Sequence, residues 1–425
     1  MSTKEKIRIG VVGVGRGRTF MHGANDLTGL ELVAICDTWE ERLLKSQKEF
    51  TDQGRNIAVY TDYDRFLEHD MDAVILANYF HQHAPFAIKA LQAGKHVMSE
   101  CSACSTLGEG VALARAVETS GKIYMLAENY PYMVYNQEMR RLFHEGLIGD
   151  FKYGEGEYIH PDSAETKLRR SCGFNHWRNW LPATYYCTHS IAPVMFITDT
   201  RPVKVNGFVV PYDNNDPTHV MACRHFDMCG IILLRMDNDA VVKSLHGGLR
   251  GHGNFVRIHG NRGLMENCRC GDRNMLRVRR EPFDKNPGEP VEKVYLPDFP
   301  EFHGEALKAG HGGGDFFTNF HFAEAVRSNQ QPYLNVYRAI DMSICGILAY
   351  KSVLDNSAPL DVPDFRDEKI RGEYENDDWS PFPGKRRPGQ PFSSITGKIR
   401  HSEKVREFAK KIWAEQGYAE KETLK

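Results

Sequence analysis

The sequence lacks long apolar runs and has no excess of charge of either sign. Its 425 residues carry a formal net charge of −2, so the composition does not point to a polyanionic partner such as a nucleic acid. No stretch approaches the roughly 20 apolar residues that cross a bilayer. The first six residues lack the apolar core of a signal peptide. We therefore expect a cytoplasmic protein of two or three domains that binds neither membranes nor nucleic acids.

The cysteines and histidines lack the spacing of disulfide or metal sites. Cys101 and Cys104 form a lone C-x-x-C, and the pair Cys268 and Cys270 has no matching second pair. Scattered cysteines in predicted strands and helices are typical of a reduced, intracellular protein. Four further candidates for metal ligation fall on different predicted elements: His160, His246, His252 and His259. The sequence therefore predicts no metal site.

What the sequence does contain is a nucleotide-binding pattern between residues 7 and 37. A β-branched apolar run, typical of a strand buried on both faces, leads into Gly13, Gly15 and Gly17 and then a helical segment. Glycines there let the backbone turn tightly and approach a pyrophosphate, whose charge lies at the helix N-terminus. A second apolar strand ends at Asp37, where a carboxylate can accept the ribose hydroxyls of NAD.

One position departs from the usual pattern, because Arg18 stands where a third glycine would fall. The alternative interpretation is an ordinary strand-to-helix turn in another kind of α/β protein. The order of strand, glycine turn, helix, strand and acid favours the cofactor. Asp37 favours NAD over NADP because a carboxylate repels a 2′-phosphate, although Arg16 and Arg18 weaken that preference.

Strands and helices continue to alternate up to residue 129, which predicts a doubly wound parallel sheet of the Rossmann type. Apolar strands at 71–77, 96–99 and 123–127 each end in a polar loop. Ligands bind at this carboxyl edge of such sheets, so the loops are expected to face the cofactor.

Beyond residue 130 the pattern changes to an α+β domain with a mostly antiparallel sheet, which we predict to extend to residue 365. Its strands are predicted at 151–160, 203–210, 219–226, 230–236, 241–245 and 255–259. Its helices are predicted at 184–196, 315–328 and 336–355, and residues 271–310 are expected to form loops. Residues 366–425 form a polar, proline-rich extension with a last helix at 402–416, and the role of this extension is open.

A chain of this order resembles the Gfo/Idh/MocA family of glucose-fructose oxidoreductases and inositol dehydrogenases. The run from Ala90 to Val97 matches the family element A-x-x-A-G-K-H-V. Dehydrogenases of the family continue with Glu-Lys-Pro, whose lysine polarises the reacting hydroxyl, whereas this chain continues with Glu100, Cys101 and Ser102. Because it lacks this lysine, the chain resembles the NAD-dependent glycosidase branch of the family, of the α-N-acetylgalactosaminidase type.

Further stretches resemble the same branch, and the resemblance covers roughly residues 5 to 365. They are residues 128–129, 154–160, 177–178, 186–193, 310–316 and 357–365. Ser190 and Ala192 replace glycines that often follow the histidine in this branch, and residues 271–303 cannot be aligned.

The resemblance implies that a small glycoside is hydrolysed by transient oxidation. NAD⁺ would remove hydride from C3 of the sugar, a base would take the C2 proton, and the C1 substituent would leave by elimination before water adds and hydride returns. The implied catalytic residues are His189, Tyr186 and His311. Tyr186 and His189 are expected on one helix face, where they can pass protons. Tyr158 and Glu128 are expected to bind the substrate. The expected cofactor contacts are Gly13, Gly15, Arg16, Gly17, Asp37, Asn78, His83, Glu100, Asn129, Trp177 and Arg178.

Two other functions remain open at this point. One is a sugar or polyol dehydrogenase of the same fold with net turnover of NAD(H), and the other is a protein that binds or senses NAD without catalysis. The sequence leaves the sugar, its anomer and the leaving group undetermined. The open antiparallel sheet of this family often pairs with a second subunit, so we expect a homo-oligomer.

Overall fold

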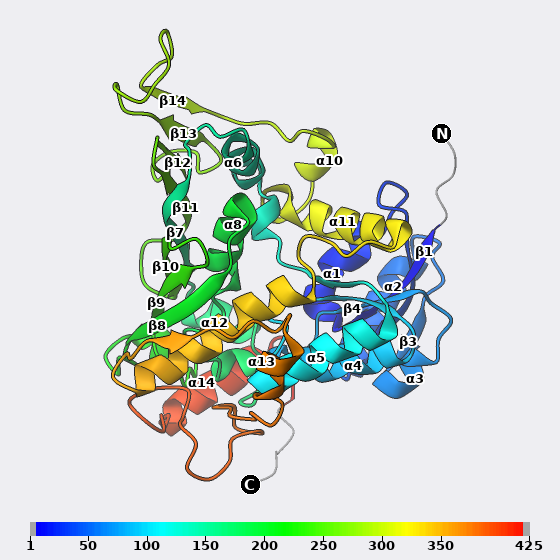
Figure 1. Cartoon of the computed structure of the whole chain (residues 1–425). Helices are drawn as coiled ribbons and strands as arrows, with labels where there is room; N and C mark the ends of the chain where they lie inside the picture. Colours follow the sequence, from blue (N-terminus) through cyan, green and yellow to red (C-terminus); the bar gives the residue numbers. More distant parts are fainter. Residues whose placement is uncertain (1–5, 420–425) are drawn as a thin grey trace.

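The computed structural model describes residues 6–419, so the first five residues of the predicted N-terminal domain and the last six of the predicted extension lie outside the described residues. Two sheets lie side by side, with helices packed on them and between them (Figure 1). The first is a parallel Rossmann sheet and the second is mostly antiparallel, so the predicted fold class is confirmed. Among the described residues, no helix combines the length and the apolar character needed to cross a bilayer.

The first sheet has six parallel strands in the order β3-β2-β1-β4-β5-β6, which is the order of a dinucleotide-binding fold. Its strands are β1 (Ile7–Val12), β2 (Leu30–Cys36), β3 (Ala58–Tyr60), β4 (Ala73–Leu76), β5 (His96–Ser99) and β6 (Tyr124–Leu126). Its helices are α1 (Val14–Gly23), α2 (Glu40–Thr51), α3 (Tyr63–Leu67), α4 (His83–Gln92) and α5 (Leu107–Ser120), with a 3-10 turn η1 (Phe80–Gln82). β4 and β6 are buried throughout because helices cover both faces of the sheet.

The second sheet has nine strands in the order β14-β13-β12-β11-β7-β10-β9-β8-β15, and only the β10–β7 pair is parallel. Its strands are β7 (Phe151–Ile159), β8 (Pro202–Val210), β9 (Cys229–Met236), β10 (Val241–Gly247), β11 (Gly253–Gly260), β12 (Leu264–Asn267), β13 (Leu276–Arg279), β14 (Glu292–Tyr295) and β15 (Leu360–Asp361). The accompanying helices are η2 (Tyr130–Tyr132), α6 (Val134–His144), α7 (Ala164–Arg169), η3 (Trp177–Asn179), α8 (Thr188–Thr198), α9 (Pro217–Met221), α10 (His303–Ala306), η4 (His311–Gly313), α11 (Gly314–Ser328) and α12 (Val336–Leu354).

Glycines on the inner face of the second sheet let two helices lie directly against it. A Cβ on Gly156 in β7 would stand 1.7 Å from the carbonyl oxygen of Ser190 in α8. A Cβ on Gly207 in β8 would stand 2.1 Å from the carbonyl oxygen of Ala349 in α12. Every residue of α8 is buried, so the polar side chains at its N-terminus are held in fixed positions over the sheet.

Two predictions about the second domain are wrong. Residues 219–226 do not form a strand, because the carboxylate of Asp216 accepts the backbone N–H of Thr218 and starts the short helix α9. Residues 271–310 are not only loops, since they contain β13, β14 and α10. The exposed faces of β13 and β14 carry ion pairs such as Arg277 with Glu292 (2.6 Å), which hides the alternation of apolar and polar residues that predicts strands.

The C-terminal extension packs against both halves of the molecule. It contains α13 (Glu368–Gly372) and α14 (Glu403–Ala414). Arg371 in α13 pairs with Glu118 of α5 at 2.6 Å, and Lys385 donates to the carbonyl oxygen of His81 at 2.9 Å. The predicted boundaries at residues 129/130 and 365/366 stay predictions.

Candidate active site

Glu128 and His189 form the buried centre of the candidate site. Glu128 follows β6 and His189 lies in the first turn of α8, so the pair joins the two sheets. Nδ1 of His189 is 2.7 and 2.9 Å from the two carboxylate oxygens of Glu128, whose exposed fraction is 0%. Burial opposes ionisation, but the charge and hydrogen bond of His189 outweigh it and lower the pKa of Glu128. Because a carboxylate only accepts hydrogen bonds, Nδ1 carries a proton, and Nε2 is the nitrogen left to exchange a proton with a substrate.

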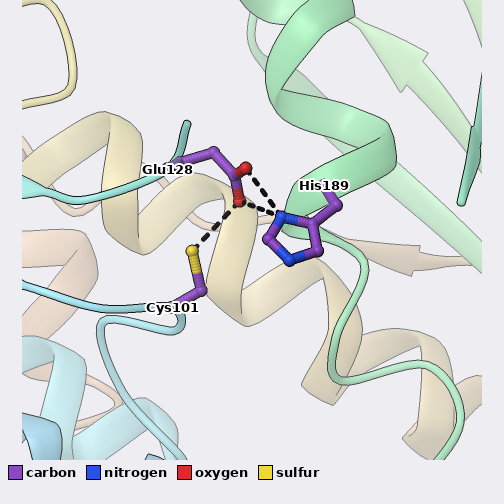
Figure 2. Close-up of side chains that lie close together, drawn as sticks. All are labelled: Cys101, Glu128 and His189. Carbon is purple, nitrogen blue, oxygen red and sulfur yellow. Dashed lines mark hydrogen bonds and ion pairs between the residues drawn. The ribbon is translucent and has the colours of Figure 1, made fainter. Parts of the chain in front are cut away.

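The thiol of Cys101 completes a triad with this pair (Figure 2). Its Sγ donates to Oε2 of Glu128 at 3.0 Å. The three donor groups lie within 4.8 Å of one another, which is close enough for a shared metal ion. Burial and the neighbouring carboxylates raise the pKa of Cys101 well above its usual value, so the triad is held by a protonated thiol rather than a thiolate ligand. The absence of a metal stays a prediction.

Three tyrosines surround His189. The ring of Tyr130 stacks on the imidazole at 4.6 Å, and the rings of Tyr158 and Tyr186 each lie 4.7 Å from it. Burial raises the pKa of Tyr158 to about 12 and raises the pKa of Tyr186 well above its usual value. Both hydroxyls are therefore proton donors at neutral pH, and His189 is the nearby group best suited to accept a proton.

Tyr186 and His189 are not on one helix face, contrary to the prediction. Tyr186 lies in the turn before α8, which begins at Thr188 after the cap residue Cys187. The two rings still meet edge to face, at an interplanar angle of 86°. The two predicted residues are therefore in contact although they do not share a helix face.

His246 is a site residue that the sequence analysis considered only as a metal ligand. It pairs with Tyr158 across β10 and β7, and the two rings stack at 5.2 Å. Its Nδ1 lies 3.1 Å from the carbonyl oxygen of Ala183 and must donate to it. Burial lowers the pKa of His246 to about 3, so the ring stays neutral and its Nε2 is a hydrogen-bond acceptor.

His311 lies at the rim of the site and belongs to a second polar cluster around Asp315. Its side chain is 45% exposed, and its Nδ1 is 2.8 Å from Oδ2 of Asp315. Oδ1 of Asp315 accepts from Asn129 at 2.7 Å and from Arg16 at 3.3 Å. Burial opposes ionisation, but the hydrogen bond of His311 and the charge of Arg16 lower the pKa of Asp315 to about 2. Asp315 thus connects α1, the end of β6 and the glycine-rich turn before α11, a role that the sequence analysis missed.

The glycine turn after β1 has the conformation that a dinucleotide site requires. Gly13 has φ +86°, and a Cβ there would stand 2.4 Å from the carbonyl oxygen of Ala77. A Cβ on Gly17 would stand 2.6 Å from the side chain of Val11, so this glycine lets α1 lie close to β1. The turn therefore leaves the N-terminus of α1 open to a phosphate group.

Asp37 lies beside the same turn, at the end of β2. Its Oδ2 accepts the backbone N–H of Val14 and its Oδ1 accepts that of Trp39, both at 2.9 Å. On the opposite side of the turn, Arg16 pairs with Glu100, so two predicted cofactor residues contact each other directly.

Three buried atoms at the carboxyl edge of the first sheet have no protein partner among the described residues. They are Oδ1 of Asn78, Nε2 of His83 and Oδ1 of Asn129. Nδ1 of His83 lies 3.0 Å from the carbonyl oxygen of Ser102, which fixes Nε2 as an acceptor. Buried acceptors are normally satisfied, so this set together with the open glycine turn fits NAD.

Trp177 and Arg178 approach this edge from the second domain. The ring of Trp177 stacks on Phe80 at 5.5 Å, and the guanidinium of Arg178 lies 4.3 Å from the Trp177 ring and 5.9 Å from the Tyr186 ring. The structure therefore brings the predicted catalytic, substrate and cofactor residues together around the carboxyl edge of the first sheet. Their individual roles stay predictions.

We expect Asp315→Asn to lower the free energy of unfolding by about 2 kcal/mol at pH 7, because a depressed carboxylate pKa stabilises the folded state. The native pKa of about 2 lies below the ordinary 3.8, so this contribution is complete above pH 3.8 and is lost as the pH falls towards 2. Urea unfolding at pH 7 and pH 3 should show the deficit falling to about half. The control is Asp64→Asn, an exposed partner of Lys89. A deficit that stays constant with pH would contradict this origin.

Comparisons with known proteins agree with this arrangement. The family described as "Oxidoreductase family, NAD-binding Rossmann fold" (Gfo/Idh/MocA) matches residues 7–128, and "Glycosyl hydrolase 109, C-terminal domain" matches residues 245–374. A glycosyl hydrolase family 109 protein of Saccharopolyspora erythraea is 27% identical over 89% of this chain and 86% of its own length. The α-N-acetylgalactosaminidase of Shewanella oneidensis is 25% identical over 88% and 87%.

Solved structures share the fold at lower identity. Levoglucosan dehydrogenase in complex with NADH and levoglucosan superposes with a TM-score of 0.70 at 19% identity, over 84% of this chain and all of that chain. Aldose-aldose oxidoreductase of Caulobacter crescentus gives 0.67 at 17% identity, again over 84% and 100%. The chain therefore joins an N-terminal domain that matches the NAD-binding Rossmann domain of the Gfo/Idh/MocA oxidoreductases to a C-terminal domain that matches that of glycosyl hydrolase family 109.

Proposed function

We propose that this protein is an NAD-dependent glycosidase that cleaves a small glycoside by transient oxidation at C3. The observation that carries the proposal is the buried Glu128–His189 pair, which presents one basic nitrogen among protonated tyrosines at the edge of an NAD-binding domain. The names of the relatives support glycoside cleavage, since they include family 109 glycosyl hydrolases and an α-N-acetylgalactosaminidase.

NAD⁺, when bound, supplies reversible hydride transfer at C3 of the sugar. Nε2 of His189 accepts a proton as the substrate is oxidised, and Glu128 stabilises the resulting imidazolium. The C3 ketone acidifies the C2 proton. After His189 has passed its first proton to solvent, Nε2 takes the C2 proton, the C1–O bond breaks by elimination and the leaving oxygen is protonated. Water then adds across C1 and C2, and hydride returns to C3. Tyr186 and Tyr158 donate hydrogen bonds to the oxygen atoms that gain charge, and His311 binds a sugar hydroxyl at the rim.

Glu128 is better suited to position His189 than to contact the sugar. Its carboxylate has no exposed surface, and both oxygens already accept hydrogen bonds from His189 and Cys101. An oriented imidazole needs such a partner to keep the proton on Nδ1 and the lone pair on Nε2. We therefore assign Glu128 as a positioning residue in place of the substrate contact that the sequence predicts.

His189→Ala should reduce turnover by about a thousandfold or more, because it removes the general base. Glu128→Gln should reduce turnover by about a hundredfold, because an amide no longer stabilises the imidazolium. Both variants should still copurify with, or bind, one NAD per chain. His144→Ala, a half-exposed histidine on α6, is the matched control. A near-native rate for His189→Ala would show that another residue is the base.

The proposed reaction is redox-neutral, so substrate cleavage should leave no net NADH. A panel of nitrophenyl α- and β-glycosides, with and without added NAD⁺, would measure nitrophenol release and NADH absorbance together. We expect nitrophenol to be released for many turnovers while NADH does not accumulate. Accumulation of NADH in proportion to product would instead indicate the alternative, a sugar or polyol dehydrogenase, and binding of NAD with no product at all would indicate a sensor.

We also propose that the chain forms a homo-oligomer through the outer face of the second sheet. Phe208 on β8 and Leu233 on β9 point to this face and are 50% and 39% exposed. Apolar side chains grouped on a sheet face are typical of a subunit contact. Light scattering should give a mass above 48.4 kDa for the native chain and a smaller mass for Leu233→Lys. A native chain that is monomeric at micromolar concentration would exclude this arrangement.

A further inference from the structure

The C-terminal segment 402–418, whose role the sequence leaves open, contains the helix α14 (Figure 1). One side of α14 is buried against α7 and the turn after α9. The members of this cluster are Leu168, Cys172, Cys223, Val405, Ala409, Ile412 and Trp413. Nε1 of Trp413 donates to the carbonyl oxygen of Leu168 at 3.1 Å. The segment is therefore firmly attached to the second domain.

The same segment braces the loop that carries two predicted cofactor residues. Trp413 meets the ring of Phe174 edge to face at 4.8 Å, and the guanidinium of Arg406 lies 4.1 Å from the same ring. Phe174 precedes Trp177 and Arg178 by only three and four residues. Movement of this loop away from the first domain would therefore disturb the contacts of Phe174 with the C-terminal segment.

The end of the segment reaches the nucleotide side of the first domain. The ring of Tyr418 lies 5.3 Å from that of Trp39, edge to face. Its hydroxyl lies against Gly173, where a Cβ would stand 2.5 Å from it. Trp39 is the residue whose backbone N–H holds Oδ1 of Asp37, the predicted ribose ligand. Tyr418 thus contacts both the Asp37 region and the loop of the second domain.

Arg42 extends this contact to the glycine turn. Its guanidinium lies 5.5 Å from the ring of Trp39. Its two terminal nitrogens and its central carbon lie 3.1–3.2 Å from the point where a Cβ on Gly15 would stand, so the group lies over the turn. Among the described residues, no acidic side chain pairs with Arg42. A guanidinium beside the open N-terminus of α1 forms a favourable environment for a pyrophosphate.

We propose that residues 402–418 are a clamp that retains NAD by fastening the Trp39–Arg42 side of the cofactor site to the Gly173–Arg178 loop through Tyr418. The inference rests on the proposed function, because a redox-neutral glycosidase regains its oxidised cofactor in each turnover and gains nothing from releasing it. Release of the dinucleotide then requires the two sides to separate and the Tyr418–Trp39 contact to break. Arg42 is a cofactor-binding residue in this arrangement, and Tyr418 acts through Trp39.

The test is the rate at which bound NADH leaves the full-length protein, followed by its fluorescence after a chase with excess NAD⁺. We expect Tyr418→Ala and Trp39→Ala each to release NADH about tenfold faster, which corresponds to about 1.4 kcal/mol, the upper range for an edge-to-face aromatic contact. The double variant should be no faster than the faster single variant, because both remove the same contact.

Further measurements show whether a change in NADH release comes from the Tyr418–Trp39 contact. Phe283→Ala removes an aromatic ring that is 84% exposed and should leave release unchanged. Glycoside turnover at saturating NAD⁺ should also be unchanged in Phe283→Ala. Tyr418→Leu, which preserves apolar packing but not the edge-to-face contact, replaces Tyr418→Ala should the latter lower the melting temperature.

Release rates within twofold of native for both single variants would overturn the clamp, as would strictly additive effects in the double variant. A protein that retains NADH but cleaves no glycoside would refute the proposed function. The NADH release rates of the variants would still test the clamp in that case. A protein that binds no dinucleotide would refute both.

Discussion

A carboxylate with no exposed surface, placed between two domains, determines how the candidate site is organised. Glu128 lies two residues after the last strand of the NAD-binding sheet, and its only charge partner among the described residues is His189 on the first turn of α8. A buried charge is costly unless it is paired and hydrogen bonded, so the two domains must pack in the register that satisfies this pair. The glycines of β7 and β8 make that register attainable by letting α8 and α12 lie directly on the second sheet. His189, the proposed base, is thereby fixed in position, with a proton on Nδ1.

The electrostatics of the site follow from this burial. Tyr158, Tyr186 and Cys101 stay protonated at physiological pH, and His246 stays neutral. His189, paired with a carboxylate, is the group through which a proton can be taken up and returned. Cys101 stands where dehydrogenases that resemble this chain have a lysine, so this position offers the substrate no cation. A neutral thiol there is consistent with a base-driven elimination rather than with activation of a hydroxyl by a positive charge.

The parts of the molecule that could be predicted from the sequence are those whose residue pattern lies within one short segment. The turn at Gly13 and the acid at Asp37 follow directly from apolar strands and their spacing, and the two-domain order follows from the change in strand pattern. The strand predicted at residues 219–226 was wrong because the cap formed by Asp216 outweighs the apolar content of that segment. β13 and β14 were missed because their exposed faces are paired by charge instead of being apolar. The role of Glu128 could not be inferred, since its partner lies 61 positions away. Tyr418 and Trp39 are farther apart still, and only the packing of α14 brings them together.

The central claim is that a C–H bond next to the anomeric carbon breaks and re-forms in every turnover. The most direct measurement is therefore the fate of deuterium at C2 of a cleaved glycoside, read by mass spectrometry or NMR of the released sugar in ordinary water. Elimination through the base predicts that the released sugar has exchanged its C2 deuterium for a solvent proton, while unreacted substrate keeps it. Complete retention of deuterium at C2 in the released sugar would contradict the account.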